Sequence, residues 1–232
     1  MKNLIITIDG TYGAAKSTVA KSLAKKLDYK YINTGAMYKQ LGKKLLERKI
    51  HPENKEKVIE LAKTIKNDKN IDFNPEAGKI TSTIAQISEV REIFNNLQRK
   101  MAKSQGVIIE GRDTGTIVFP DADFKFFLTA SLEVRAKRMH NRLLKEGSEE
   151  EKSKYPTYKD LMPYIQECDD KDMNREIAPL KMADDAILFD NSDSPTGEHG
   201  VEHDANILKY YITHLEDIKR NIRRKNGIQS NK

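Results

Sequence analysis

The sequence predicts an α/β fold in which a five-stranded parallel sheet is flanked by helices. Five short apolar runs, rich in β-branched or aromatic residues, alternate with longer segments of helical periodicity. Strands that are apolar on both faces and separated by helices are typical of such a sheet. Polar residues follow most of these runs, at the edge where parallel sheets bind ligands. The predicted strands are residues 4–8, 29–32, 107–109, 124–128 and 186–189.

The first predicted strand leads through a glycine-containing turn into a helix. Residues 10–18 read Gly-Thr-Tyr-Gly-Ala-Ala-Lys-Ser-Thr, close to the P-loop pattern of Gly, four free positions, Gly, Lys and Ser or Thr. Gly10 and Gly13 permit a turn whose backbone N–H groups, with the helix dipole, meet polyphosphate. Lys16 would lie along the outer phosphates, and the Ser17 hydroxyl would reach magnesium. The alternative is an ordinary turn with a solvated lysine, which does not account for Lys-Ser-Thr directly after it.

One position departs from the P-loop pattern. The second glycine is replaced by Ala15. Alanine is tolerated there if the backbone φ is negative, as in the first residue of a helix, and is costly if φ is positive.

Two segments interrupt the alternation of strands and helices and are predicted to be insertions. Residues 53–103 are helical in pattern except for a turn at 71–78, marked by Asn-Pro and Gly. Residues 140–156 are polar, and a helix follows from about Tyr158 to Arg175. Charged, glycine-containing connections are solvated surface or, in some enzymes, lids.

Arginines gather on the helix predicted after residue 128. Arg135, Arg138 and Arg142 are spaced three and four residues apart, so they would share one face. This face either clamps phosphates or is a solvated helix face. By the same spacing, Cys168 is expected to share a face with Asp172 and Arg175.

The third predicted strand ends in Glu110-Gly111-Arg112-Asp113. An arginine between two acids at the end of an apolar strand costs desolvation unless a ligand or a partner uses these charges. The segment is therefore a candidate binding site, with a purely structural ion pair as the alternative.

Composition limits the classes of protein. The chain has 232 residues, of which 38% are hydrophobic and 33% charged, as in soluble globular proteins. The first apolar run is too short for a signal peptide or a membrane span, and Cys168 is the only cysteine, so we expect a cytoplasmic protein. Of the net charge of +6, residues 217–232 carry +5, which leaves nucleic-acid binding as a hypothesis for this tail alone. The simpler alternative for the tail is the frayed end of a helix.

Four blocks of sequence together resemble the bacterial cytidylate kinases, P-loop enzymes that phosphorylate CMP and dCMP with ATP. The third block is the most specific. The blocks are Ile8-Asp9-Gly10 with Lys16-Ser17-Thr18, then residues 34–38 (Thr-Gly-Ala-Met-Tyr), residues 110–122 (Glu-Gly-Arg-Asp-Thr-Gly-Thr-Ile-Val-Phe-Pro-Asp-Ala), and residues 169–175 with 178–180.

The resemblance implies strand order 2-3-1-4-5 and a site with two halves, which would bind MgATP and CMP. The residues implied for ATP are Gly10, Thr11, Tyr12, Gly13, Ala14, Ala15, Lys16, Ser17, Thr18, Arg135 and Arg138, with Ser17 on Mg²⁺. Those implied for CMP are Thr34, Lys39, Ser82, Arg91, Arg112, Asp113, Asp172 and Arg175. Lys16, Arg112, Asp113 and Arg175 are the implied catalytic residues. Cations and backbone dipoles around two anionic substrates can supply most of the catalysis of phosphoryl transfer.

The chain also departs from the family. Ala15 replaces a glycine, Asn33 an aspartate, and Lys39 and Cys168 arginines. Lysine keeps the charge but loses bidentate geometry, whereas cysteine loses the charge. The insertion before Ser82 is short, since the family usually has an extra antiparallel β element there and about ten residues are available.

We therefore expect a monomeric (d)CMP kinase with a core of residues 1–33, 104–139 and 176–216. Residues 34–103 would form the monophosphate-binding insertion, 140–175 the lid and 217–232 a basic tail. Two alternatives remain at this point. One is a catalytically weak nucleotide-binding or RNA-associated protein, and the other a P-loop kinase for another small acceptor.

Overall fold

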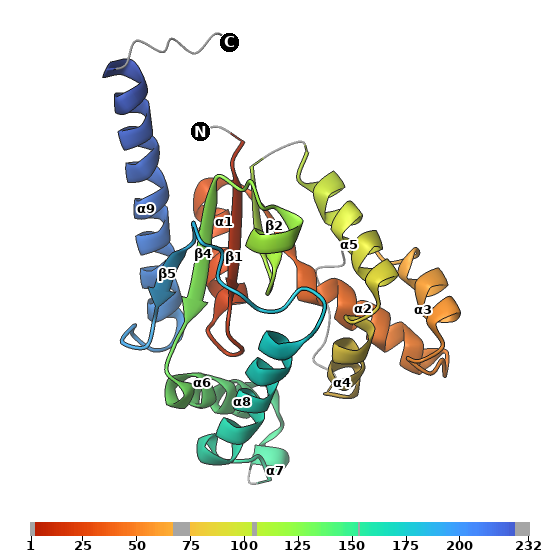
Figure 1. Cartoon of the computed structure of the whole chain (residues 1–232). Helices are drawn as coiled ribbons and strands as arrows, with labels where there is room; N and C mark the ends of the chain where they lie inside the picture. The colour runs from red at the N-terminus through yellow and green to blue at the C-terminus, as the bar shows by residue number, and fades with distance from the viewer. Residues whose placement is uncertain (1–2, 67–74, 104–105, 153, 226–232) are drawn as a thin grey trace.

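The computed structural model describes residues 3–66, 75–103, 106–152 and 154–225. At its centre is a five-stranded parallel sheet with the order β2-β3-β1-β4-β5 (Figure 1). The strands are β1 (Ile5–Gly10), β2 (Lys30–Asn33), β3 (Val107–Glu110), β4 (Phe124–Thr129) and β5 (Ile187–Asp190). The fold class and the strand order predicted from the sequence are confirmed.

The strands lie within two residues of their predicted bounds because the central ones are buried on both faces. Ile6 and Ile8 of β1 and Ile108 and Ile109 of β3 are fully buried. Residue Ile8 of β1 is in register with Glu110 of β3. The segments that follow these two strands therefore begin side by side at one edge of the sheet.

Helices α1 (Lys16–Leu27) and α9 (Gly197–Lys225) cover one face of the sheet, and Figure 1 shows α9 (blue) running past the sheet. Helix α1 packs into this layer through Val19 and Leu23, both fully buried. Leu208 of α9 belongs to the same hydrophobic cluster. The phosphate-loop candidate thus connects two buried elements, β1 and α1.

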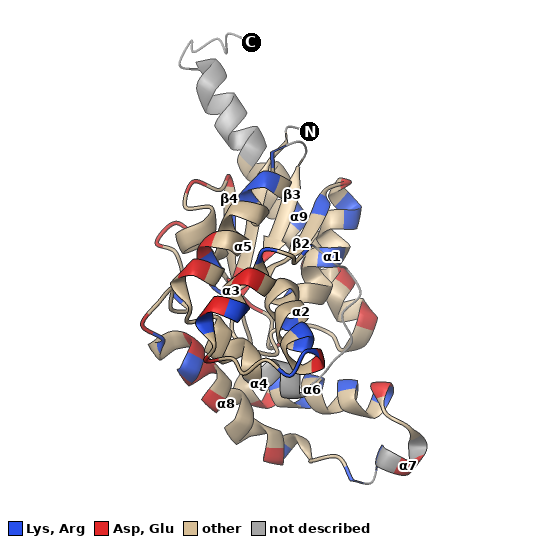
Figure 2. Ribbon diagram, turned by 90° about the vertical axis from the view of Figure 1, so that its right-hand side faces the viewer, with Lys and Arg blue, Asp and Glu red and all other residues tan. Residues whose placement is uncertain are grey.

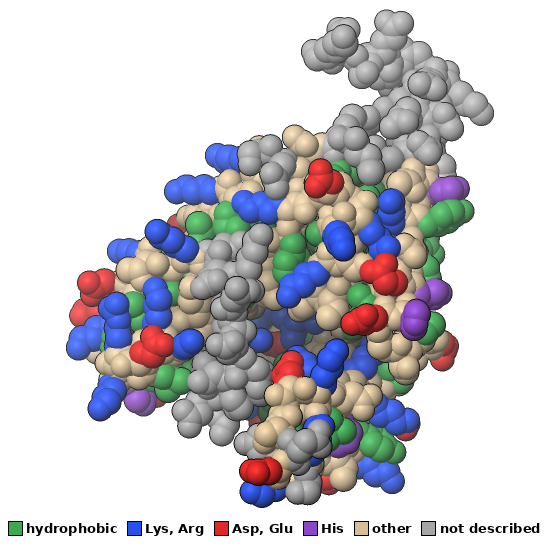
Figure 3. All heavy atoms as spheres, turned by 180° about the vertical axis from the view of Figure 1, so that it is seen from behind, with side chains coloured by type: hydrophobic (Ala, Val, Ile, Leu, Met, Phe, Trp, Pro, Cys, Tyr) green, Lys and Arg blue, Asp and Glu red, His purple; other side chains and the backbone are tan. Residues whose placement is uncertain are grey.

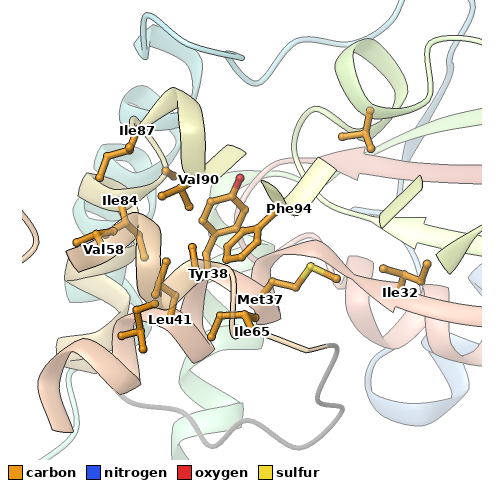
Figure 4. Packing of buried hydrophobic residues seen from close by; sticks show 14 of the residues in the cluster. Ile32, Met37, Tyr38, Leu41, Val58, Ile65, Ile84, Ile87, Val90 and Phe94 are labelled. Carbon is orange, nitrogen blue, oxygen red and sulfur yellow. The ribbon is translucent and has the colours of Figure 1, made fainter. Parts of the chain in front are cut away.

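A second hydrophobic cluster lies beside the opposite face. It is formed by β2 and β3 with α2 (Thr34–Glu47), α3 (Lys55–Ala62), α4 (Pro75–Ile84) and α5 (Ser88–Met101). Figure 4 shows the rings of Tyr38 and Phe94 in edge-to-face contact at its centre, with centroids 4.8 Å apart at 83°. This packing holds α2 and α5 beside the ends of β2 and β3.

The turn predicted at residues 71–78 is wrong in its second half. Helix α4 begins at Pro75 and includes Gly78, while residues 71–74 lie outside the described part. Proline suits the first position of a helix, where its missing N–H would have had no helical partner. Pro75 therefore marks the start of a helix here.

Helices α6 (Leu132–Glu146) and α8 (Tyr158–Asn174) border the carboxyl edge of the sheet, and α7 (Glu149–Lys152) lies farther from it (Figure 1). Helices α6 and α8 pack together through buried Ala136, Leu161 and Ile165. The start of α8 has a capping box between Thr157 and Asp160. Helix α6 crosses the predicted boundary between core and lid at residue 140, and the domain boundaries remain a prediction.

No helix in the described ranges is both long and apolar enough to cross a bilayer. The backbone of α9 continues to Lys225, into the predicted basic tail. Residues 226–232 and the side chains from 216 onward lie outside what the structure describes, so the RNA hypothesis for the tail remains a hypothesis.

Candidate active site

The loop between β1 and α1 has the backbone geometry of a tight turn. Gly10 has φ 143° and Gly13 has φ 79°, both positive, and a Cβ at Gly10 would lie 1.9 Å from the carbonyl oxygen of Leu128. Ala15 has φ 60° and ψ 18°, so it is in the left-handed region. The sequence left the sign of φ at this position open. In the structure φ is positive, the sign that is energetically costly for alanine.

Lys16 is the first residue of α1 and is only 6% exposed. Its Nζ donates a hydrogen bond of 2.6 Å to the carbonyl oxygen of Thr11 within the loop. Burial, followed by the positive charge of Arg112, lowers the pKa of Lys16 to about 7, although nearby carboxylates oppose the shift. A buried ammonium that lacks a full counter-charge is suited to an anion.

Ser17 begins a hydrogen-bonded chain that leads away from the loop. Its Oγ donates to Glu110 Oε1 at 2.8 Å, and the Tyr31 hydroxyl donates to the same oxygen at 3.2 Å. Asn33 Nδ2 donates to the Tyr31 oxygen at 3.1 Å, and Asn33 Oδ1 caps α2 through the N–H of Ala36. The ends of β2 and β3 thereby position the loop hydroxyl, a contact that the sequence did not predict.

Asp9 joins the first strand to the segment after β3. Its buried carboxylate accepts from Thr114 N at 3.0 Å, Thr114 Oγ1 at 2.8 Å and Gly115 N at 2.7 Å. Burial raises the pKa of Asp9 in spite of these hydrogen bonds. The carboxylate fixes the start of the one-turn π-helix η1 (Thr114–Val118), which follows Asp113. The sequence placed Asp9 at the strand end but did not predict this role.

Three of the predicted arginines converge on two carboxylates beyond β3. Arg91 of α5 forms an ion pair with Asp113, and Arg112 Nε lies 2.7 Å from Asp172 Oδ2 of α8. Arg175 lies 3.5 Å from both Asp113 and Asp172. This arginine–aspartate cluster has one more positive than negative charge. Helix α5, the loop after β3 and the C-terminal end of α8 contribute to it. Figure 2 shows acidic and basic residues interspersed along the ribbon around α3 and α8.

The predicted common face of Cys168, Asp172 and Arg175 is only partly formed. Helix α8 ends at Asn174, and Arg175 has extended backbone angles, φ −66° and ψ 140°. Its guanidinium donates to the carbonyl oxygen of Ala178 and pairs with Asp113 in the arginine–aspartate cluster. Cys168 is half-buried on the helix, where burial raises the pKa of its thiol.

The arginines of α6 do not form one phosphate-facing surface. Buried Arg135 donates to the carbonyl oxygens of Ala130 at 2.9 Å and Tyr12 at 3.0 Å and pairs with Asp169. Arg138 donates to Asn191 Oδ1 at 2.8 Å and to the Asn191 carbonyl oxygen at 2.7 Å. Arg142 is exposed and lies 4.0 Å from Glu146. Equal spacing along the helix did not produce equal surroundings.

The remaining predicted CMP residues lie on α2 and α4. Thr34 is buried and its Oγ1 donates to the carbonyl oxygen of Glu110 at 2.9 Å. Lys39 has a lowered pKa because of desolvation and then the charge of Arg142. Ser82 is an exposed residue of α4. Thr34 therefore belongs to the framework of the site, and Lys39 lies in the electrostatic field of Glu110 and Arg112.

Seen from behind, the surface is hollowed between the α6–α8 end and the rest of the molecule, and Lys and Arg side chains lie in the hollow (Figure 3). Among the described residues, no three His, Cys, Asp or Glu side chains gather as in a protein-held metal site. The oxygens of Ser17 and Glu110 nevertheless match the ligands that Mg²⁺ prefers, since it is held by few protein groups together with phosphates.

Comparison with known proteins gives consistent matches over most of the chain. Residues 6–210 match the family described as cytidylate kinase. The cytidylate kinase of Caldanaerobacter subterraneus subsp. tengcongensis is 41% identical, over 81% of this chain and 87% of that protein. The cytidylate kinase of Clostridium botulinum (strain Langeland) is 39% identical, over 90% of this chain and 99% of that protein. In fold, the chain is similar to a shikimate kinase from Bacteroides thetaiotaomicron, with TM-score 0.50, 18% identity and coverage of 90% and 98%.

Proposed function

Because this chain belongs to the cytidylate kinase family, we propose that it transfers the γ-phosphate of ATP to CMP or dCMP, giving ADP and CDP or dCDP. It is a nucleoside monophosphate kinase. One relationship in the structure carries the proposal for the site. The phosphate loop follows β1, the arginine–aspartate cluster begins directly after β3, and the last residue of β3, Glu110, is in register with Ile8 near the end of β1. Neighbouring parallel strands are about 4.8 Å apart, so donor and acceptor phosphates would meet at this edge.

The loop from Gly10 to Thr18 would bind the phosphates of ATP through backbone N–H groups and the start of α1. Lys16 would move its Nζ from the Thr11 carbonyl oxygen to a phosphate oxygen and would be held protonated there. Mg²⁺, bound by the phosphates and the Ser17 hydroxyl with Glu110 behind it, would neutralise charge on the transferred group. Arg135 and Arg138 would support ATP binding without contacting ATP. Arg135 bonds to Tyr12 in the loop, and Arg138 bonds to Asn191.

The arginine–aspartate cluster would bind the monophosphate. Arg91, Arg112 and Arg175 can each exchange a carboxylate oxygen for a phosphate oxygen without moving to new surroundings. Asp113, Ser82 and Thr34 would contribute to reading the base, Asp172 to holding the ribose, and Lys39 to the phosphate. An oxygen of the CMP phosphate then attacks the γ-phosphorus of ATP, the bond to the β–γ bridging oxygen breaks, and ADP leaves. Fixed cations and dipoles at these oxygens lower the barrier.

The discriminating experiment offers CMP, dCMP, UMP, AMP and GMP separately with MgATP and measures ADP formation in a coupled assay. We expect turnover with CMP and dCMP to exceed that with the other three acceptors. ADP formation that is equal for all acceptors, or that occurs without any acceptor, contradicts the proposal. We further propose a cytoplasmic monomer in which nucleic acid could contact only the basic tail, because the positive charge is concentrated there.

A further inference from the structure

Ala15 occupies a backbone conformation that alanine disfavours. Its φ of 60° and ψ of 18° place it in the left-handed region. In this region Cβ crowds the following carbonyl oxygen, so only glycine enters it freely. The residue lies directly before Lys16, and a change in its φ would redirect the loop N–H groups. Contacts from outside the loop are therefore expected to hold this peptide.

Asn191, in the connection between β5 and α9, makes such a contact. Its Nδ2 donates to the carbonyl oxygen of Ala14 at 3.2 Å. That oxygen belongs to the planar peptide unit joining Ala14 to Ala15. Rotation of this unit changes ψ of Ala14 and φ of Ala15 together, and in a trans peptide the Ala15 N–H points away from the oxygen. A hydrogen bond to the oxygen thus fixes both the sign of φ and the direction of the N–H.

The amide of Asn191 is itself held in one orientation. The residue is fully buried, Arg138 Nη1 donates to its Oδ1 at 2.8 Å, and its Nδ2 also donates to Asp204 Oδ2 at 2.9 Å. Asp204 is 2% exposed and accepts from Ser194 Oγ at 2.5 Å. A flipped amide would turn its NH₂ toward a guanidinium and its oxygen toward two other oxygens, so the neighbours allow only the observed orientation.

We propose that Asn191 is a positioning residue for the phosphate loop. Oriented by Arg138 and Asp204, it holds the Ala14–Ala15 peptide and so makes alanine usable at a position that favours glycine. Arg138 then supports ATP binding through Asn191 without touching ATP. The inference rests on the proposed function only in that the loop binds ATP phosphates.

The test is a double-mutant cycle with Asn191→Ala and Ala15→Gly, read by calorimetric binding of MgATP without acceptor and by KM for each substrate. In the chain with Ala15, Asn191→Ala is expected to weaken ATP binding about tenfold, the effect of one lost buried hydrogen bond, while KM for CMP changes less than about twofold. With glycine at position 15, the same substitution is expected to cost about threefold or less, because glycine adopts positive φ without help. Equal losses in both backgrounds overturn the proposal.

Two further variants keep the test decisive. Asn191→Ser retains a polar group for Arg138 but is too short to reach Ala14, and it replaces Asn191→Ala if that protein does not fold. Ser192→Ala is the matched control, because the Ser192 hydroxyl donates to Asp190 Oδ1 and accepts from the N–H of Ser131, both outside the phosphate loop. ATP binding by Ser192→Ala should equal that of the unchanged protein.

A rise in both KM values for Asn191→Ser, together with a lowered Tm, would show a merely structural role and overturn the proposal. If the unchanged protein binds ATP but does not transfer phosphate to CMP, the proposed function is contradicted and this inference still stands.

Discussion

The carboxylate of Asp169, on α8, accepts a hydrogen bond of 2.8 Å from the backbone N–H of Tyr12 in the phosphate loop. The other carboxylate oxygen pairs with Arg135 of α6, whose guanidinium also reaches the Tyr12 carbonyl oxygen. The ring of Tyr12 meets Tyr164 of α8 edge to face, with centroids 6.1 Å apart. The predicted lid helix therefore contacts the loop directly through the Tyr12 N–H and the Tyr12 ring, and indirectly through Arg135, which pairs with Asp169 and donates to the Tyr12 carbonyl oxygen.

Asp169→Asn should destabilise the protein and weaken ATP binding with little effect on CMP. Asparagine can still accept from Tyr12, but Arg135 would be left as a buried charge without its counter-ion. Removing one partner of a buried ion pair costs about 3–5 kcal/mol of unfolding free energy. Urea unfolding and ATP titration measure the two effects. Asp170→Asn, at an exposed neighbouring position, is the control and should change neither; equal stability of both variants contradicts the importance of the pair.

The strands and the loop were predictable because their signals are local. Apolar runs buried on both faces marked the sheet, and Gly10, Gly13, Lys16 and Ser17 lie within one turn and one helix start. The contacts that hold the loop were not predictable, because they join residues that are far apart in the sequence. Asp169 bonds to Tyr12 across 157 positions, and Asn191 to Ala14 across 177, and no periodicity encodes such pairs.

The surroundings of the arginines on α6 were also not predictable from their spacing in the sequence. The same helical interval predicted one face for Arg135, Arg138 and Arg142, yet the first is buried, the second bonds to Asn191 and the third is exposed. A guanidinium can form its hydrogen bonds with carbonyl oxygens, a carboxylate or water. Which of these partners it meets depends on segments that are distant in the sequence. The positive φ of Ala15 was unpredictable for the same reason, since its supporting contact comes from the opposite end of the chain.

Lys16→Met should abolish phosphoryl transfer and leave the fold intact. The ammonium is buried and has one bond, to Thr11, so an apolar side chain of similar length removes a desolvation cost and keeps the packing. Loss of a charge placed at the transferred group should lower kcat at least about hundredfold. Steady-state kinetics and thermal unfolding test both parts. Near-normal turnover would refute the P-loop assignment.

ATP affinity should fall with rising pH above neutrality because Lys16 must be protonated when phosphate binds. Its pKa in the free protein is lowered to about 7, first by burial, and bound phosphate must raise it. The complex therefore takes up a proton, and Kd should increase up to about tenfold per pH unit between about pH 7.5 and 9. Calorimetry in two buffers of different ionisation enthalpy measures the uptake. Lys16→Arg, which stays charged, is the control and should lack both the slope and the uptake; an unchanged Kd for Lys16 over this range contradicts the lowered pKa.

Position 168 provides the prediction that separates phosphate handling from base reading. The half-buried thiol lies one turn before Asp172, in the field of both Asp172 and Arg112, where the family resemblance expects an arginine. A charge-assisted hydrogen bond is worth about 1.5–3 kcal/mol, and each 1.4 kcal/mol is about tenfold in rate. We therefore expect this enzyme to be slower, and with its short insertion less base-selective, than the resemblance implies, while still preferring cytosine.

Cys168→Arg should raise kcat with CMP several-fold and leave the ratio of kcat/KM for CMP and UMP nearly unchanged. The gain should be below the full value of a charged hydrogen bond, because a long side chain on this helix must be ordered and Arg112 already pairs with Asp172. Cys168→Gln adds length without charge and should give no gain. Kinetics with CMP, dCMP and UMP in the three proteins decide between the possibilities. If Cys168→Arg and Cys168→Gln behave alike, charge is not what position 168 lacks, and if base preference shifts at constant rate, the residue reads the base and not the phosphate.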